Sequence, residues 1–361
     1  YSHINSNIHR AAHKLAREAT AAHEAARETI ATHLNCAHAH ELIFTSGTTD
    51  SINLVSNTLA LSGKISAGDK IIISALEHHA NIVPWQMLCQ RTGASLEIIP
   101  IHEDGTFDME AYQGMLDESV KLVSISHVSN ALGTINPVST IISMAKQHDA
   151  LVLVDGAQAA PHFKIDVQEL NCDFYVFSGH KIYGPTGIGI LYGKEQILNE
   201  LPPWRGGGEM IKEVTFEHTT YNDLPFKYEA GTPDIEGAIA MAAAIDYMNA
   251  IGMEKIAAHE SYLEQKTTAA LKEINGIKLY GTAPQKAAVV SFRIEGIHHY
   301  DLGTLLDQMG VAVRTGHHCC QPLMARYGIT GTVRASFAAY NTEQEVDAFI
   351  EALHKATRML S

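Results

Sequence analysis

Short apolar runs recur along the first half of the chain, and each has the length and composition of a buried strand. They are rich in Ile, Val, Leu or Phe and lie at 41–45, 70–75, 95–101, 121–127, 150–155, 174–178 and 187–192. Segments with helical spacing, such as 137–148, lie between them. This alternation predicts a doubly wound α/β domain on a mostly parallel seven-stranded sheet.

Helical patterns also mark both ends of the chain. Apolar residues recur at spacings of three and four between positions 15 and 34, ahead of the first strand. After about residue 250 the strand runs become sparser, and Thr342 with Glu345 forms a capping box that begins a final amphipathic helix. We therefore expect a large cofactor-binding α/β domain over 1–250 and a smaller α+β domain over 251–361.

Composition narrows the class of protein. The 361 residues are 46% hydrophobic and 18% charged, which suits a folded protein with a sizeable core. A net charge of −14, without any long run of Lys or Arg, argues against a nucleic-acid partner. The chain also lacks the roughly 20 consecutive apolar residues of a membrane span. We expect a cytoplasmic protein, although the sequence opens at Tyr1 without Met and an upstream or organellar targeting segment stays open.

The cysteine pattern points to a reducing compartment. Five cysteines without a CxxC spacing form neither a disulfide framework nor a zinc site. We expect no bound metal.

Polar residues gather where the apolar runs end, which is where open α/β sheets place their functional groups. The first run ends in SGTT at 46–49 and enters a helix, an arrangement that binds phosphate but that also serves simply as a helix cap. The fifth run delivers Asp155 into a turn that contains Gln158, and the sixth delivers SGHK, ending in Lys181.

Each of these groups alone has an ordinary explanation, since a strand-end Asp commonly forms a turn and a lone Lys is commonly solvated. Together, an acid, a lysine and a phosphate cradle on three strand ends meet the needs of pyridoxal phosphate. The lysine amine bonds to the cofactor, the acid keeps the pyridine nitrogen protonated, and hydroxyls hold the phosphate. Two further strand ends contribute His78, an imidazole suited to lie over a flat ring, and Asn130, an amide suited to a ring oxygen or a substrate carboxylate.

Several motifs resemble one family. DGAQ at 155–158, SGHK at 178–181, EAGTP at 229–233 and RTGHHC at 314–319 resemble class V, fold-type I cysteine desulfurases. The resemblance is closest to the SufS/CsdA branch, which includes enzymes described as selenocysteine lyases. It covers essentially the whole chain, through EHHANIVPW at 77–85, HVSN at 127–130 and RAS at 334–336.

The resemblance implies a role for each matching residue. Lys181 would carry pyridoxal 5'-phosphate as a Schiff base, Asp155 would pair with the pyridine nitrogen, and Gln158 would contact the ring hydroxyl. His78 would stack on the ring. The phosphate would be held by Thr48, Thr49, Ser178 and His180, with Thr232 reaching it from the other subunit of a homodimer. The substrate carboxylate would be held by Asn130 and Arg334, with His9, Arg10 and Arg314 lining the entrance.

Cys319 decides the type of reaction. Two histidines and Arg314 close in sequence favour its thiolate, which is the nucleophilic form. An inert buried cysteine and a metal ligand are the alternatives, although a zinc site from consecutive residues is geometrically poor. The resemblance implies conversion of L-cysteine to L-alanine, with the sulfur held as a persulfide on Cys319. A sulfur-acceptor protein of the SufE/SufU type would then take it for iron–sulfur cluster or other sulfur biosynthesis.

Other functions stay open at this point. A selenocysteine lyase would act on L-selenocysteine with the same site. A class V aminotransferase or kynureninase-like hydrolase would leave Cys319 without a task, and a non-catalytic subunit would leave Lys181 and Asp155 without one. The sequence departs from the family at Cys320, which stands where the motif has Ala. This second thiol either fills space, accepts sulfur or becomes oxidised.

Overall fold

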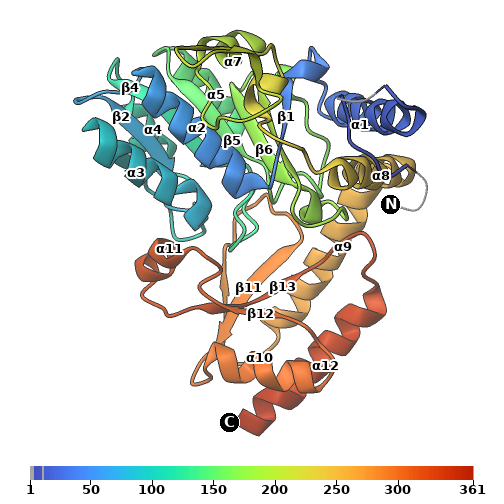
Figure 1. Ribbon diagram of the computed structural model, residues 1–361. Helices are drawn as coiled ribbons and strands as arrows, with labels where there is room; N and C mark the ends of the chain where they lie inside the picture. The colour runs from blue at the N-terminus through green and yellow to red at the C-terminus, as the bar shows by residue number, and fades with distance from the viewer. Residues whose placement is uncertain (1–3, 10–11, 361) are drawn as a thin grey trace.

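The structure, a computed structural model, describes residues 4–9 and 12–360. A seven-stranded sheet with its helices forms the upper part of the molecule in Figure 1, and a four-stranded sheet forms the lower part. The long helix α9 (Met253–Lys272) leads from one to the other.

The larger sheet is the mostly parallel seven-stranded sheet that the sequence predicts. Its strands are β1 (Leu42–Thr45), β2 (Lys70–Ser74), β3 (Ser95–Ile99), β4 (Val120–Ser126), β5 (Leu151–Asp155), β6 (Phe174–Ser178) and β7 (Gly189–Gly193). Their order is β1-β7-β6-β5-β4-β2-β3. Only β7 runs antiparallel to its neighbours β1 and β6, and the other pairs are parallel. The carboxyl ends of β4, β5 and β6 therefore meet at one edge.

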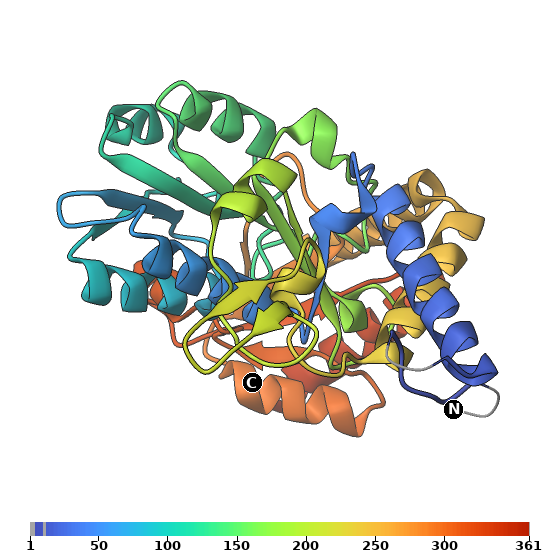
Figure 2. The ribbon, with the colours of Figure 1, turned by 45° about the horizontal axis from the view of Figure 1, so that its top comes forward.

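Helices cover both faces of this sheet, which explains why its strands are apolar throughout. One face packs against α2 (Thr48–Ser62), α3 (Val83–Thr92) and α7 (Glu195–Glu200). The other packs against α1 (Lys14–His33), α4 (Met109–Met115), α5 (Val138–Lys146), α6 (Val167–Leu170) and α8 (Ile235–Ile251). Helices α1 and α8 lie side by side along one flank (Figure 2). The predicted first helix and the helix at 137–148 are thus confirmed, with ends shifted by one or two residues.

The smaller sheet is antiparallel throughout. It consists of β10 (Ile277–Tyr280), β11 (Val289–Ile294), β12 (Arg314–Gly316) and β13 (Thr332–Ser336), in the order β10-β11-β13-β12. Helices α9, α10 (His299–Gln308) and α12 (Glu343–Leu360) enclose its own apolar core, and α11 (Gln321–Arg326) follows the loop after β12. The predicted capping box is present, because Thr342 N donates to Glu345 Oε2 at 2.7 Å and Glu345 N donates to Thr342 Oγ1 at 3.3 Å.

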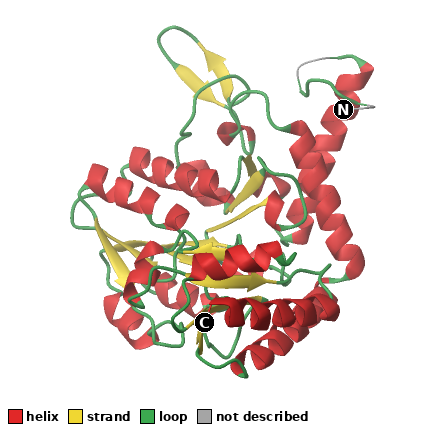
Figure 3. Ribbon diagram, turned by 90° about the horizontal axis from the view of Figure 1, so that it is seen from below, coloured by secondary structure: helices red, strands yellow, loops and turns green. Residues whose placement is uncertain are grey.

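A third, two-stranded sheet projects from the body of the molecule (Figure 3). It pairs β8 (Ile211–Val214) with β9 (Thr219–Tyr221), and the turn between them exposes Phe216 fully. No helix in the described part of the chain has both the length and the apolar character that a bilayer crossing demands.

Candidate active site

The predicted phosphate cradle forms where β1 and β6 end. Gly47, with φ 142°, turns the chain so that α2 begins at Thr48. The Thr48 backbone N–H donates to Ser178 Oγ at 2.8 Å, and the two hydroxyl oxygens lie 2.7 Å apart. Thr49 and His180 line the same cavity of about 650 Å³. The positive dipole end of α2 and the hydroxyl groups around it make this cavity suited to a phosphate.

The acid and the lysine lie beside the cradle. Asp155 at the end of β5 is buried, and its Oδ1 accepts a hydrogen bond from Ala157 N at 2.9 Å. Burial raises the pKa of Asp155, and the charge of Lys181 opposes that rise. Burial lowers the pKa of Lys181, and the charge of Asp155 opposes that fall. Lys181 Nζ also donates to Gln158 Oε1 at 3.2 Å. The structure therefore brings together the three residues predicted for the pyridine nitrogen, the ring hydroxyl and the reactive carbon of the cofactor.

The glycine between Asp155 and its turn has a packing reason. A Cβ on Gly156 would lie 2.0 Å from Cε1 of Tyr175, which is fully buried. The Tyr175 hydroxyl is fixed in turn at 3.0 Å from His127 Nδ1. The DGAQ turn can thus approach β6 only with glycine at its second position.

His78 joins this group from the end of β2. Its Nδ1 accepts a hydrogen bond from Ala80 N at 3.1 Å, which orients the ring at the start of a short 3₁₀ turn. Burial, followed by the charge of Lys181, lowers the pKa of His78 to about 4. The imidazole is therefore neutral at pH 7, the form suited to packing against an aromatic ring.

Cys319 lies in a strained loop after β12. His318 and Cys319 have φ of 53° and 59°, a left-handed conformation that costs L-residues about 1–2 kcal/mol each. Three hydrogen bonds hold it: His79 N donates to Cys319 O at 2.8 Å, Asn130 Nδ2 donates to His318 O at 2.7 Å, and Cys319 N donates to His317 Nδ1 at 3.1 Å. Two of the three donors, His79 N and Asn130 Nδ2, lie in loops that follow β2 and β4 of the larger sheet.

Two arginines flank the thiol. Arg314 and Arg334 face each other across the β12–β13 pair, and Arg314 Nη2 lies 3.5 Å from Cys319 Sγ. Arg334 Nη1 donates to Asn130 O at 2.7 Å, and burial together with the charge of Arg314 lowers the pKa of Arg334 to about 10. Within 4–9 and 12–360, no carboxylate forms an ion pair with either guanidinium. Two adjacent cations without a counter-ion make a favourable site for a small anion.

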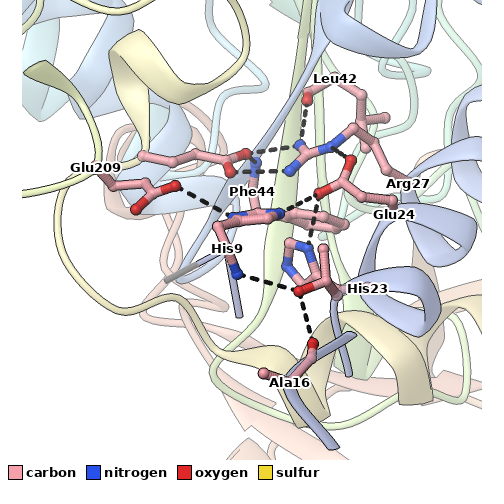
Figure 4. Close-up of polar contacts among 10 residues, drawn as sticks. His9, Ala16, His23, Glu24, Arg27, Leu42, Phe44 and Glu209 are labelled. Carbon is pink, nitrogen blue, oxygen red and sulfur yellow. Dashed lines mark hydrogen bonds and ion pairs between the residues drawn. The ribbon is translucent and has the colours of Figure 1, made fainter. Parts of the chain in front are cut away.

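Thr232 lies three residues after Glu229, which forms a buried ion pair with Arg27 (Arg27 is labelled in Figure 4). Arg27 Nη1 and Nη2 donate to the carboxylate of Glu229 at 2.7 and 2.9 Å, and Phe44 N donates to Glu229 Oε1 at 2.7 Å. This ties EAGTP to β1. Thr232 lines a cavity of about 210 Å³ that shares Ser46 and neighbouring residues with the phosphate cavity.

The structure describes two of the three residues predicted to line the entrance, His9 and Arg314. His9 Nε2 lies 3.1 Å from Glu24 Oε1, and His9 Nδ1 lies 3.2 Å from Glu209 Oε1 (Figure 4). These contacts place His9 beside α1, and among the described residues none of its bonds reaches Asn130, Arg314 or Arg334. Arg10 lies outside the described residues.

The sequence interpretation missed the groups that hold the reactive loop. His79 contributes its backbone N–H and also accepts from Gln321 N through Nε2 at 3.1 Å, while His318 Nε2 lies 2.8 Å from Thr332 Oγ1. Cys320 is fully buried, and its Sγ donates to Asn130 Oδ1 at 3.0 Å. The signals for these roles were two of the three histidine doublets, at 78–79 and 317–318, and the departure from the family motif at Cys320.

Comparisons with known proteins agree with this geometry. Residues 1–349 match the family model described as aminotransferase class-V. The cysteine desulfurase of Salmonella agona (strain SL483) is 50% identical over all 361 residues, which cover 88% of that relative. Among solved structures, the cysteine desulfurase CsdA of Escherichia coli aligns with a TM-score of 0.92 at 39% identity, covering 99% of this chain and 88% of that one. A cysteine desulfurase from Thermococcus onnurineus NA1 aligns with a TM-score of 0.95 at 38% identity, covering 99% and 89%.

The chain therefore belongs to the class V aminotransferase family, the class that its fold and its Asp155–Lys181 site define. Within that family its place is among the cysteine desulfurases, as the predicted resemblance implies.

Proposed function

We propose that this chain uses pyridoxal 5'-phosphate to remove sulfur from L-cysteine, holding the sulfur on Cys319 as a persulfide and releasing L-alanine. One observation carries the proposal: contacts from the larger sheet and the arginines of the smaller one converge on the Cys319 loop. Arg314 Nη2 lies 3.5 Å from Cys319 Sγ, and Asn130 Nδ2 donates to His318 O at 2.7 Å. Burial lowers the pKa of Lys181, and the charges of Arg334 and Arg314 contribute to the fall, which supports a site shared by the thiol and the amine.

The residues present fit the cofactor. The buried carboxylate of Asp155 has the position and the acceptor oxygens for a protonated pyridine nitrogen, and the α2 cradle supplies N–H and hydroxyl donors for a phosphate. Lys181 would bond to the cofactor, His78 would cover its ring and Gln158 would face its hydroxyl. The phosphate would be held by Thr48, Thr49, Ser178 and His180, and from the other subunit by Thr232. When bound, the cofactor supplies an electron sink that weakens the C–S bond of the amino acid.

The residues of the chain perform the proton and sulfur transfers. The lowered pKa of Lys181 increases the share of free amine at neutral pH, so Lys181 can accept the proton from the substrate Cα. Cys319 Sγ attacks the substrate sulfur as a thiolate. An S–S bond forms while the C–S bond breaks, and the bonding electron pair stays with the carbon fragment, which becomes alanine after protonation.

Arg334 would hold the substrate carboxylate. It is half-buried, whereas Arg314 is exposed, and a guanidinium can donate two parallel hydrogen bonds to a carboxylate. Asn130 would assist, although its amide also holds the Cys319 loop. His9, Arg10 and Arg314 would line the entrance.

The remaining steps concern partners. We propose a homodimer in the cytoplasm that passes its persulfide to an acceptor protein of the SufE/SufU type. L-selenocysteine is the alternative substrate.

The test supplies L-cysteine to the holoenzyme and measures alanine, with mass spectrometry mapping the persulfide. We expect alanine and a persulfide on Cys319, both lost in Cys319→Ser and both retained in the matched control Cys89→Ser. Full cysteine-dependent alanine release by Cys319→Ser would overturn the proposal. Faster turnover of L-selenocysteine than L-cysteine, with Cys319→Ser still active on selenium, would favour the lyase.

A further inference from the structure

A series of hydrogen-bonded side chains connects Lys181 to α9, the helix between the two sheets. Lys181 Nζ donates to Gln158 Oε1 at 3.2 Å, and Gln158 Nε2 lies 3.3 Å from His162 Nε2. His162 Nδ1 lies 2.7 Å from Glu260 Oε2, on α9. His162 and Glu260 are 6% and 2% exposed, so water does not compete for the contact between them, whereas Gln158 and Lys181 are half-buried.

The two ends of this chain fix the direction of every hydrogen bond within it. An ammonium group can only donate and a carboxylate can only accept, whereas an amide and a neutral imidazole can each be turned either way. With His162 as the neutral imidazole, Glu260 therefore requires the proton of His162 to be on Nδ1, which leaves Nε2 as an acceptor. Gln158 must then direct its NH₂ group at His162 and its oxygen at Lys181.

We propose that Glu260 and His162 are positioning residues for Lys181, which lock the amide of Gln158 with its oxygen facing the amine. The proposal rests on the proposed function only for the role of Lys181, and it concerns the state in which Lys181 is not bonded to the cofactor. The opposite amide orientation would direct N–H groups at an ammonium group whose pKa the charges of Arg334 and Arg314 already lower. Through Glu260 and His162, the proton affinity of Lys181 depends on α9, a helix outside the seven-stranded sheet that Lys181 follows.

The test uses the full-length apoenzyme and requires no turnover. Glu260→Met removes the acceptor at the end of the chain, so Lys181 loses stabilisation of its ammonium form. We expect labelling of Lys181 by an amine-reactive reagent at pH 8 to become roughly three- to tenfold faster, equivalent to a pKa decrease of about 0.5–1 unit. Glu264→Met, one turn later on α9, removes a second buried carboxylate without contact to His162 and should change the rate less than twofold.

Two further comparisons separate positioning from a general structural effect. In a Gln158→Met background there is no amide to orient, so Glu260→Met should no longer change Lys181 labelling. His162→Leu should reproduce the acceleration, whereas His162→Gln, which keeps one donor and one acceptor, should restore much of the native rate. Nitrogen-15 NMR of the native protein should show the proton of His162 on Nδ1.

Unchanged labelling in both Glu260→Met and His162→Leu would overturn the proposal, as would an acceleration that persists in the Gln158→Met background or a proton on Nε2. Because none of these measurements uses L-cysteine, failure here and failure of the desulfurase proposal are distinguishable.

Discussion

The neighbouring thiols Cys319 and Cys320 should differ greatly in reactivity. Cys320 is fully buried, donates to Asn130 Oδ1, and has a pKa raised to about 12 by burial. At pH 8 only about 1 in 10,000 Cys320 side chains is a thiolate, compared with about a quarter for an ordinary thiol of pKa ~8.5. Because alkylation requires the thiolate, Cys320 should react at least about a thousandfold more slowly than an ordinary exposed thiol.

A timed pulse of iodoacetamide at pH 8, followed by unfolding, digestion and fragment mass spectrometry, measures this difference. Cys319 should be modified within the pulse, while Cys320 should stay unmodified both in the native chain and in Cys319→Ser, where no modified neighbour blocks access. Cys172, also buried and with a pKa raised to about 12, is the internal standard. Alkylation of Cys320 within tenfold of the Cys319 rate, with Cys172 still protected, would refute the reasoning and make Cys320 a candidate sulfur acceptor.

Two stability predictions follow from buried ionisable groups. Arg27→Met should reduce the free energy of unfolding by roughly 3–5 kcal/mol, because it leaves the Glu229 carboxylate buried without its cation. Urea unfolding measures this loss, with the exposed substitution Lys14→Met as the control. A loss below about 1 kcal/mol would contradict the prediction. Burial lowers the pKa of His127 to about 4 from 6.5, so the unfolded chain binds more protons than the folded one between these pH values. The stability that neutral His127 contributes is therefore fully present above pH 6.5 and is lost as the pH falls towards 4. It amounts to at most about 3 kcal/mol, and His127→Gln should flatten the pH dependence of urea unfolding over this window; an equally steep loss in the variant would exclude His127 as its source.

The strands, and the polar residues at their carboxyl ends, could be predicted because local sequence determines them. The run at 174–178 is identical to β6, and the other six predicted strands differ from the observed ones by one or two residues at their ends. Parallel strands place their carboxyl ends at one edge, so Asp155 and Lys181 had to be neighbours once both followed adjacent strands.

Direction and pairing were less accessible. A strand buried on both faces has the same composition whichever way it runs, so nothing in 187–192 indicated that β7 is antiparallel to both neighbours. The sequence predicts that the Asn130 amide meets a ring oxygen or a substrate carboxylate, and no local pattern indicated that its Nδ2 also donates to a carbonyl 188 positions further along the chain. The domain boundary near residue 250 stays a prediction.

The left-handed backbone at His318 and Cys319 has a consequence for engineering. The thiol is covalently part of the smaller sheet, yet the donors that keep its loop in this conformation, His79 and Asn130, come from the larger one. A chimaera that grafts only the segment after β11 of this chain into a homologue without a counterpart of Asn130 would carry the nucleophile without one of these donors, and we expect its loop to leave the left-handed conformation. Recombination libraries should therefore exchange the strand ends after β2 and β4 together with that segment.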